Sequence, residues 1–229
     1  MFIKKLKELN INYSAEQLQQ LKIYFELLKV WNEKINLTTI ISESEVYNKH
    51  FFDSLLLSKK ITLKDQTICD VGTGAGFPGI VLKIFFPKLK LFLVEAVTKK
   101  CVFLKELVDV LQLKEVLIID ERVENISVKY REFFDIVTAR AVAKLNVLLE
   151  LCIPILKLEG YFIALKAEVN DELKDSLVAC KKLKTKLVYN YVSEWEFLGK
   201  RTILYFKKLD VTSRKYPRNY SKIKKLPLK

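Results

Sequence analysis

A glycine-rich segment between Ile68 and Gly79 is the feature that most constrains how this chain can fold. It reads Ile-Cys-Asp-Val-Gly-Thr-Gly-Ala-Gly-Phe-Pro-Gly, so an apolar run contains Asp70 near its end, passes through alternating glycines and enters a stretch compatible with a helix. Alternating glycines permit tight turns with positive φ and let a ligand approach the backbone without meeting Cβ atoms. The pattern therefore predicts a strand, a ligand-binding turn and a helix in succession. A turn without a ligand is the weaker interpretation.

Two familiar nucleotide-binding loops do not match this segment. The dinucleotide fingerprint Gly-x-Gly-x-x-Gly requires glycine where the chain has Phe77, and the Gly-Lys-Ser/Thr ending of a P-loop is missing. The pattern that does match, Asp-x-Gly-x-Gly-x-Gly, is typical of class I methyltransferases that use S-adenosylmethionine. Glu95 supports this interpretation because it ends the next apolar run, where a carboxylate can accept both hydroxyls of a ribose. An exposed glutamate at a strand end is the alternative.

After the turn, short β-rich runs alternate with helical periodicity, which predicts a mostly parallel sheet. We expect strands over Thr67–Val71, Leu89–Glu95, Val116–Ile119, Asp135–Thr138, Tyr161–Leu165, Leu187–Val192 and Thr202–Phe206. We expect helices over Gly79–Phe85, Thr98–Leu111, Leu145–Leu156 and Asp171–Leu183. Only a short turn separates the last two strands, so they should form a hairpin that adds an antiparallel strand. The predicted fold class is α/β with a Rossmann-like sheet.

The first 60 residues are predicted to be a helical extension packed on this sheet. Apolar residues recur at three- and four-residue steps after Ser14, and Ser14-Ala15-Glu16-Gln17 has the form of a capping box. A second helix is expected from about Ser42 to Leu57. We predict a single domain over 1–229, with its core at 67–208 and a basic C-terminal tail at 209–229.

The positive charge of the chain is concentrated in its C-terminal part. The formal net charge is +13, and residues 176–229 contain 15 Lys or Arg against three acids. Such asymmetry favours a polyanion such as RNA as partner. A lysine-rich compositional bias is the alternative, because only six of the 40 basic residues are Arg. That bias explains the abundance of lysine but not the lack of acids after Asp210.

The cysteines and the hydropathy pattern narrow the class of protein further. The four cysteines stand far apart beside a single histidine, so we predict no metal site and small buried cysteines in a reducing compartment. The longest stretch without Asp, Glu, Lys or Arg, Val71–Leu82, is too short to span a membrane. The charged start of the chain does not resemble a signal peptide. We therefore expect a cytoplasmic protein without a membrane partner.

The chain lacks the residues that are characteristic of several kinds of methyltransferase. Methylation of an exocyclic amine goes with Asn/Asp-Pro-Pro-aromatic after the fourth strand, where this chain has Thr138-Ala139-Arg140-Ala141. Carbon-5 pyrimidine methylation needs a thiolate, typically after proline, and no cysteine follows a proline. Ribose methylation favours an acid at the position of Arg140. Guanine N7 needs none of these, because its free lone pair attacks directly once nucleophile, methyl and sulfur are held in line. No catalytic acid or base is then expected.

Motifs along nearly the whole chain resemble those of a known family. They are Trp31-Asn32-Glu33-Lys34-Ile35-Asn36-Leu37-Thr38, His50-Phe51-Phe52-Asp53-Ser54-Leu55, Asp70 to Gly79, Lys99-Lys100, Arg122-Val123-Glu124, Arg140-Ala141, Leu165-Lys166 and Tyr216-Pro217-Arg218. In this order they are similar to the bacterial ribosomal small-subunit RNA methyltransferase G family, formerly called glucose-inhibited division protein B. The resemblance implies S-adenosylmethionine as cofactor and N7 of a guanine in 16S ribosomal RNA as target. Ala167 departs from the family, in which glycine usually follows the lysine.

The resemblance also implies roles for individual residues. Besides Glu95, the residues expected to contact the cofactor are Gly72, Phe77, Val123, Glu124 and Arg140. The candidate RNA-binding residues are chosen for their positive charge and position rather than from the resemblance; they are Lys99, Lys100, Lys166, Lys222, Lys224 and Lys225. The tail that holds the last three is expected to lie outside the Asp70–Arg140 constellation. Asp53 and Ser54 are expected to order the glycine turn by hydrogen bonding, and His50 to act likewise or approach the substrate.

Two other functions stay open at this point. One is an NAD-dependent oxidoreductase, which stabilisation by S-adenosylmethionine but not by NAD would exclude. The other is a non-catalytic RNA-binding ribosome factor on a methyltransferase scaffold, which methyl transfer to ribosomal particles would exclude. The expected partner is 16S ribosomal RNA or the small ribosomal subunit, and the protein is expected to be a monomer.

Overall fold

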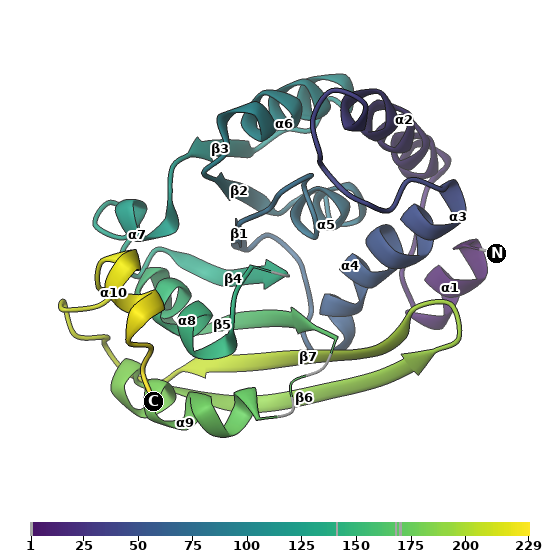
Figure 1. Cartoon of the computed structure of the whole chain (residues 1–229). Helices are drawn as coiled ribbons and strands as arrows, with labels where there is room; N and C mark the ends of the chain where they lie inside the picture. Colours follow the sequence, from purple (N-terminus) through teal and green to yellow (C-terminus); the bar gives the residue numbers. More distant parts are fainter. Residues whose placement is uncertain (1, 141, 168, 170) are drawn as a thin grey trace.

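Strand β1 (Thr67–Val71) lies inside a seven-stranded sheet in the computed structural model, which describes residues 2–140, 142–167, 169 and 171–229 (Figure 1). The strand order is β3-β2-β1-β4-β5-β7-β6. The other strands are β2 (Lys90–Glu95), β3 (Val116–Asp120), β4 (Phe134–Arg140), β5 (Leu156–Lys166), β6 (Thr185–Trp195) and β7 (Gly199–Lys208). Strands β1 to β5 pair in parallel, and β7 is antiparallel to both β5 and β6. The predicted parallel sheet with an antiparallel hairpin is therefore confirmed.

Two layers of helices cover the two faces of the sheet (Figure 1). One layer packs α1 (Phe2–Glu8), α2 (Ala15–Asn32), α5 (Gly79–Phe85) and α6 (Thr98–Val110) into one hydrophobic cluster. The other packs α7 (Val123–Ile126), α8 (Leu145–Cys152) and α9 (Glu172–Leu183) into a second cluster. Ile68 belongs to the first cluster and Cys69 to the second. This follows because successive side chains of a strand point to opposite faces of a sheet.

The N-terminal helices bear out the sequence pattern, with one addition. The capping box is present: Gln17 N–H donates to Ser14 Oγ at 3.2 Å, and Ser14 N–H donates to Gln17 Oε1 at 2.8 Å. The second helix is a composite of α3 (Glu43–Glu45), a π-helical segment (Val46–Phe52), α4 (Asp53–Leu55) and a 3-10 segment (Leu56–Lys60). The π-helical segment was not predicted. Such segments often occur at functional sites, and this one contains His50.

Two boundaries on the second face differ from the prediction. The helix expected to reach Leu156 ends at Cys152, and β5, expected from Tyr161, already begins at Leu156 after a 3-10 turn over Ile153–Ile155. Pro154 explains the change, because proline has no N–H to donate and disrupts a continuing α-helix.

Among the described residues, no helix combines the length and apolarity that crossing a bilayer requires.

The segment predicted as a basic tail is a packed part of the domain. It contains a short helix, α10 (Tyr220–Lys225), that lies beside α7 and α8 (Figure 1). Tyr216, Ile223 and Leu228 are buried in the second hydrophobic cluster, with exposed fractions of 5% or less. The residues after β7 are therefore held against the sheet at its second face.

Candidate active site

The turn after β1 has the backbone conformation that its glycines predict. Gly72, Gly74 and Gly76 have φ of +65°, +60° and +97°, a region that side chains with a Cβ rarely occupy. The N–H of Gly72 donates to the Val94 carbonyl at 2.8 Å, which fixes the turn to β2. A Cβ at Gly76 would lie only 2.7 Å from Tyr24 Oη. The turn is thus closely packed, with Tyr24 of helix α2 directly against it.

The buried Asp70 side chain accepts hydrogen bonds from residues of the turn. Its Oδ2 accepts hydrogen bonds from Thr73 Oγ1 at 2.7 Å and from the N–H of Gly79 at 2.8 Å. Its Oδ1 is buried and has no hydrogen-bond partner among the described residues. Complete burial raises the pKa of Asp70 to about 6, and the two hydrogen bonds oppose that rise. A free acceptor therefore lies under the turn.

Glu95, at the end of β2, faces the same turn. Its Oε2 accepts from the N–H of Gly74 at 3.0 Å, and its Oε1 accepts from the N–H of Val97 at 2.9 Å. It is only 7% exposed, so the interpretation of Glu95 as an exposed strand-end glutamate is wrong. Both oxygens retain lone pairs that can accept hydroxyl donors.

A cavity in front of Glu95, called the turn cavity here, brings together four of the six residues predicted to bind the cofactor. Its walls are Val71, Gly72, Val94, Glu95, Ala96, Glu121, Arg122, Val123, Glu124, Val142, Leu151 and Tyr220. Six of these twelve residues are aliphatic, Glu95 is the buried carboxylate among them, and Gly72 contributes its backbone. Such a site suits a flat apolar ring joined to a diol, as in a nucleoside.

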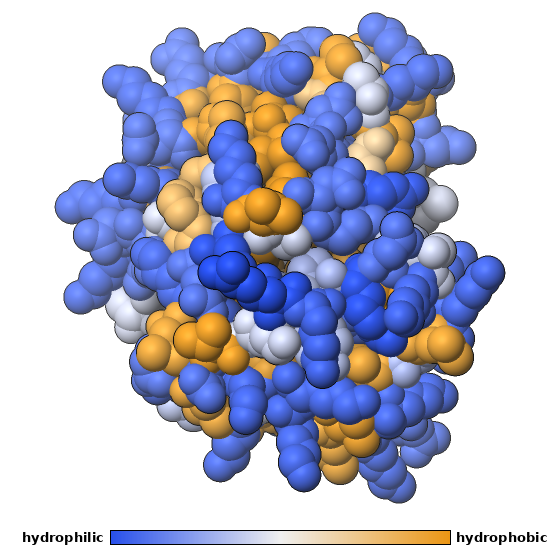
Figure 2. All heavy atoms as spheres, turned by 90° about the vertical axis from the view of Figure 1, so that its left-hand side faces the viewer, coloured by the Kyte–Doolittle hydropathy of each residue, from blue (hydrophilic) through white to orange (hydrophobic). Residues whose placement is uncertain are grey.

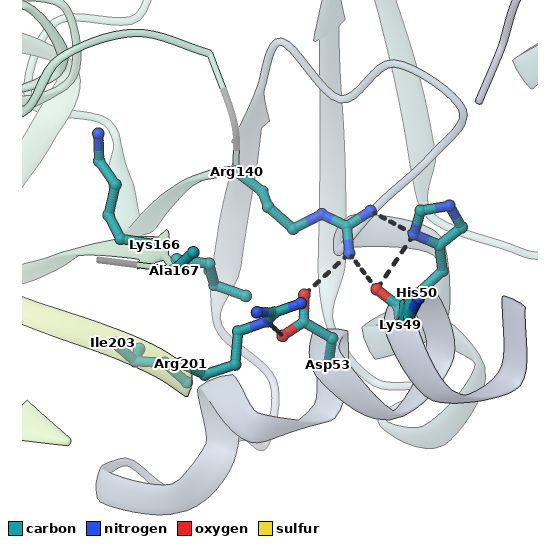
Figure 3. A pocket seen from close by; sticks show the side chains of 9 residues that line it. Lys49, His50, Asp53, Arg140, Lys166, Ala167, Arg201 and Ile203 are labelled. Carbon is teal, nitrogen blue, oxygen red and sulfur yellow. Dashed lines mark hydrogen bonds and ion pairs between the residues drawn. The ribbon is translucent and has the colours of Figure 1, made fainter. Parts of the chain in front are cut away.

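A second pocket, called the basic pocket here, lies at the ends of β4 and β5 (Figure 3). Its walls are Lys49, His50, Asp53, Arg140, Leu165, Lys166, Ala167, Arg201 and Ile203. Four of these side chains are cationic and one is a carboxylate. The excess of positive charge suits an anionic ligand such as a phosphodiester.

Asp53 holds two of these cations in place. Its Oδ2 lies 3.1 Å from Arg140 Nη1, and its Oδ1 lies 3.0 Å from Arg201 Nε (Figure 3). Ser54 Oγ donates to the His50 carbonyl at 2.6 Å, within its own helical run. Neither side chain has a hydrogen bond to the glycine turn among the described residues, so that prediction is wrong. Asp53 instead orients the arginines of the basic pocket.

His50, in the wall of the basic pocket, is neutral, and both of its ring nitrogens lie within hydrogen-bond distance of polar groups. His50 Nδ1 lies 3.2 Å from Arg140 Nη2 and 3.1 Å from the Lys49 carbonyl oxygen. His50 Nε2 lies 2.8 Å from Thr38 Oγ1. Burial, together with the charge of Arg140, lowers the pKa of His50 to about 3. Among its possible roles, orientation of Arg140 is the one the geometry supports.

Phe77 lies behind the basic pocket. Its ring stacks against His50 at 4.5 Å and against Tyr24 at 5.2 Å between centroids, and the Arg140 guanidinium carbon is 5.0 Å from its centroid. It is 4% exposed and belongs to the wall of neither cavity. Contact of Phe77 with a cofactor therefore stays a prediction. Arg140, in contrast, lines the basic pocket and is one of the predicted cofactor residues.

The predicted RNA-binding lysines occupy three places. Lys99 and Lys100 lie at the start of α6, and the lysines of α10 are exposed beside the turn cavity. Lys166 lines the basic pocket, where Nζ donates to Glu172 Oε2 and to the Ala143 carbonyl, both at 2.8 Å. Hydrophilic residues cover most of the face that carries α7 and α10 (Figure 2). Ala141, quoted with Arg140 as a motif, lies outside the described residues.

The residues of these cavities that the sequence analysis missed include Lys49, Arg201 and Tyr220. Tyr220 also corrects the expectation that the C-terminal segment lies outside the Asp70–Arg140 constellation. A usable signal for Arg201 was the rarity of arginine in a lysine-rich chain. Five of the six arginines make specific contacts here; they are Arg122, Arg131, Arg140, Arg201 and Arg218. Among the described residues, no group of three or more His, Cys, Asp or Glu is placed to hold a metal ion.

Comparisons with known proteins agree with this arrangement. Residues 17–196 match the family model described as rRNA small subunit methyltransferase G. The chain is 46% identical to ribosomal RNA small subunit methyltransferase G of Lysinibacillus sphaericus, over 99% of this chain and 98% of that protein. It is 45% identical to the protein of the same name from Mycoplasma capricolum, over 94% of each. The fold is similar to a SAM-dependent methyltransferase from Aquifex aeolicus, with a TM-score of 0.56, 18% identity, and coverage of 79% of this chain and 98% of that one.

Proposed function

Because this chain belongs to the rRNA small subunit methyltransferase G family and is an rRNA methyltransferase, we propose that it methylates N7 of a guanine in 16S ribosomal RNA with S-adenosylmethionine. We propose that it acts as a monomer in the cytoplasm, on the RNA or on the small ribosomal subunit. The observation that carries the proposal is the position of two different sites at the end of β4. Arg140 lines the basic pocket, and Val142, two residues later, lines the turn cavity.

The turn cavity fits the adenosyl part of S-adenosylmethionine. Glu95 can accept the ribose hydroxyls, and Val94, Val123 and Leu151 provide an apolar wall for the purine. Gly72 lines the cavity with backbone alone, since a Cβ there would lie 2.7 Å from a methyl carbon of Val142. When bound, the cofactor supplies an activated methyl group on its sulfonium.

Asp70 and Arg140 provide opposite charges toward the amino-acid end of such a cofactor. Asp70 Oδ1 is a buried acceptor that lacks a partner among the described residues, so a bound ammonium or a water can satisfy it. Arg140 can meet a carboxylate or an RNA phosphate, because two of its nitrogens are already oriented by Asp53 and His50. We propose that both residues position the cofactor and that neither transfers a proton.

The basic pocket fits a guanine nucleotide. Guanine presents O6 as an acceptor beside N7, and arginine and lysine donors can bind O6 and the nearby phosphates while the N7 lone pair stays free. Arg201 and Lys166 line the pocket with charged nitrogens. The reaction needs only alignment, because N7 carries no proton to remove. A neutral, hydrogen-bonded His50 agrees with chemistry that does not use a general base.

The proposal is tested with small subunits from a strain that lacks this gene. The purified protein and radiolabelled S-adenosylmethionine should label 16S RNA, and chemical cleavage at N7-methylguanosine should map one site. Labelling at another atom would contradict the N7 assignment. Failure to label either subunits or naked RNA would favour the non-catalytic alternative. Thermal stabilisation by NAD and not by S-adenosylmethionine would favour the oxidoreductase.

A further inference from the structure

The C-terminal segment after β7 is anchored to the domain by hydrogen bonds that it both accepts and donates. Arg131 Nη1 donates to the Tyr216 carbonyl at 3.0 Å, and Arg131 Nη2 donates to the Thr212 carbonyl. Thr212 Oγ1 donates to the Leu183 carbonyl at 3.0 Å. These contacts fix the path of the chain from the end of β7 toward α10, which Figure 1 shows beside α7 and α8.

A buried ion pair fixes the segment immediately before α10. Arg218 Nε donates to Glu150 Oε1 at 2.7 Å, and Arg218 Nη2 donates to Glu150 Oε2 at 2.6 Å. The backbone N–H of Arg218 also donates to Oε1, at 3.0 Å. The Glu150 side chain, on α8, has no exposed surface. Loss of its cationic partner is strongly unfavourable for a buried carboxylate, so the pair holds this segment in one position.

Tyr220 lies two residues beyond this anchor, at the start of α10, and lines the turn cavity with Glu95 and Val123. Below it, Ile223 is fully buried, which sets the rotation of the short helix. The guanidinium carbon of Arg122 is 5.4 Å from the centroid of the Tyr220 ring. Arg122 directly precedes α7, so the ring is positioned against the element that supplies Val123 and Glu124.

We propose that Tyr220 is a cofactor-binding residue whose ring forms a wall of the adenosyl subsite. This inference rests on the proposed function for the identity of the ligand. An aromatic ring held at the edge of an aliphatic cavity provides a stacking or edge contact for a purine. The Arg218–Glu150 pair is then a positioning contact, because it holds α10 where Tyr220 reaches the cavity. The site for the cofactor thus includes a residue from the last ten of the chain.

The test compares Tyr220→Ala and Tyr220→Phe with the parent protein by calorimetric titration of S-adenosylmethionine, S-adenosylhomocysteine and adenosine. Loss of the ring should weaken binding of all three about tenfold, the range of base–aromatic stacking. Tyr220→Phe keeps the ring and should bind within about twofold of the parent. Tyr189→Ala, at an exposed tyrosine of β6, is the matched control and should leave affinity unchanged.

The melting temperature of the free protein separates cofactor contact from a purely structural role. If Tyr220→Ala lowers it, Tyr220→Leu replaces that variant, since leucine retains apolar burial without the ring. Unchanged affinity in a folded variant without the ring, or a loss for S-adenosylmethionine that adenosine does not share, would overturn the inference alone. A parent protein that does not bind S-adenosylmethionine would overturn the proposed function, and this inference with it.

Discussion

The Asp53 carboxylate lies 3.1 Å from Nη1 of Arg140 and joins the N-terminal helical run to the end of β4, across 87 positions of sequence. Its second oxygen lies 3.0 Å from Nε of Arg201 on β7. One carboxylate therefore orients two guanidinium groups of the basic pocket (Figure 3). The N-terminal extension is accordingly part of the site, because without it neither arginine would have a counterion at this position.

Removing the charge of Asp53 should loosen both arginines. We expect Asp53→Asn to lower the free energy of unfolding by about 1–3 kcal/mol, because hydrogen bonds between charged groups of limited exposure are lost. Methylation of small subunits should fall as well. Urea unfolding measures the first effect, and Glu26→Gln serves as control because its pair with Lys29 is exposed. Equal changes in both variants would contradict a special role for Asp53.

Glu95→Gln should weaken S-adenosylmethionine binding by about 1–3 kcal/mol. The carboxylate accepts from two backbone N–H groups, and a glutamine amide has a single acceptor oxygen to share between the turn and a ribose. Calorimetric titration measures the affinity. Asp120→Asn is the matched control: Asp120 pairs with Glu95 in the register of β2 and β3, yet it is exposed and outside the turn cavity. A negligible loss with Glu95→Gln would mean that another group holds the ribose.

Burial of Asp70 predicts a specific pH dependence of stability. Its pKa is raised to about 6 in the folded protein, so as pH rises from about 4 the Asp70 carboxyl ionises in the unfolded chain before it does so in the folded one. The stability that this group contributes is present at low pH and is lost through pH 6. Relative to Asp70→Asn, the parent should lose roughly 2–4 kcal/mol of unfolding free energy between pH 4 and pH 7. Urea unfolding of both proteins across that range measures the difference. A difference between the two proteins that stays constant across this pH range would contradict the raised pKa of Asp70.

The single histidine allows a direct test of its protonation state. Burial and Arg140 lower the pKa of His50 to about 3, so the folded protein should show no histidine titration by NMR between pH 5 and 8. The unfolded chain should titrate near pH 6.5. Because only the unfolded state takes up a proton in this window, stability should fall as pH drops below about 6.5, by about 1.4 kcal/mol per unit from this group. A midpoint near 6.5 in the folded protein would show that His50 is solvated.

Local chemistry explains which parts of the fold could be predicted from the sequence. The bounds of β1 and α5 agree with the prediction residue for residue, because a buried apolar run and a glycine turn limit them. Strand β6 is longer than predicted: it covers Thr185–Trp195 where Leu187–Val192 was expected. Four of the five additional residues are polar, and their backbone pairing with β7 does not show in the hydropathy pattern.

Some residues of the candidate site could likewise be predicted from the sequence, and others could not. Gly72 and Glu95 were found because each has a signal within a few residues of sequence, a turn pattern or a strand end. Arg201 and Tyr220 have no such signal, since their roles depend on contacts between distant segments. Arg201 meets a carboxylate 148 positions away, and Tyr220 lines the turn cavity from a segment whose Arg218 pairs with Glu150 on α8. The segment after β7 was predicted to be a basic tail outside the core, although Tyr216, Ile223 and Leu228 within it are buried.

The lysines of α10 remain predicted RNA contacts. Lys222, Lys224 and Lys225 are exposed, while Ile223 between them is buried, so their replacement by Gln changes the charge of the surface and leaves the core packing intact. If they bind phosphates, the triple variant should bind the small subunit more weakly. The slope of log affinity against log salt should decrease by about 0.7 for each phosphate that a lysine no longer neutralises. A binding titration at low and at physiological salt measures both effects.

The matched control for that experiment removes the same charge from the other end of the molecule. Lys4, Lys7 and Lys22 are exposed on α1 and α2, far from α10 in Figure 1, and their replacement by Gln should leave the salt slope unchanged. Affinity for S-adenosylmethionine should stay the same in both triple variants, because Tyr220 and the Arg218–Glu150 pair are retained. Equal slopes for the α10 variant and the parent would mean that these lysines are a solvated face. A lower slope in the α10 variant alone would place RNA phosphates beside the turn cavity, since Tyr220 on the same helix lines it.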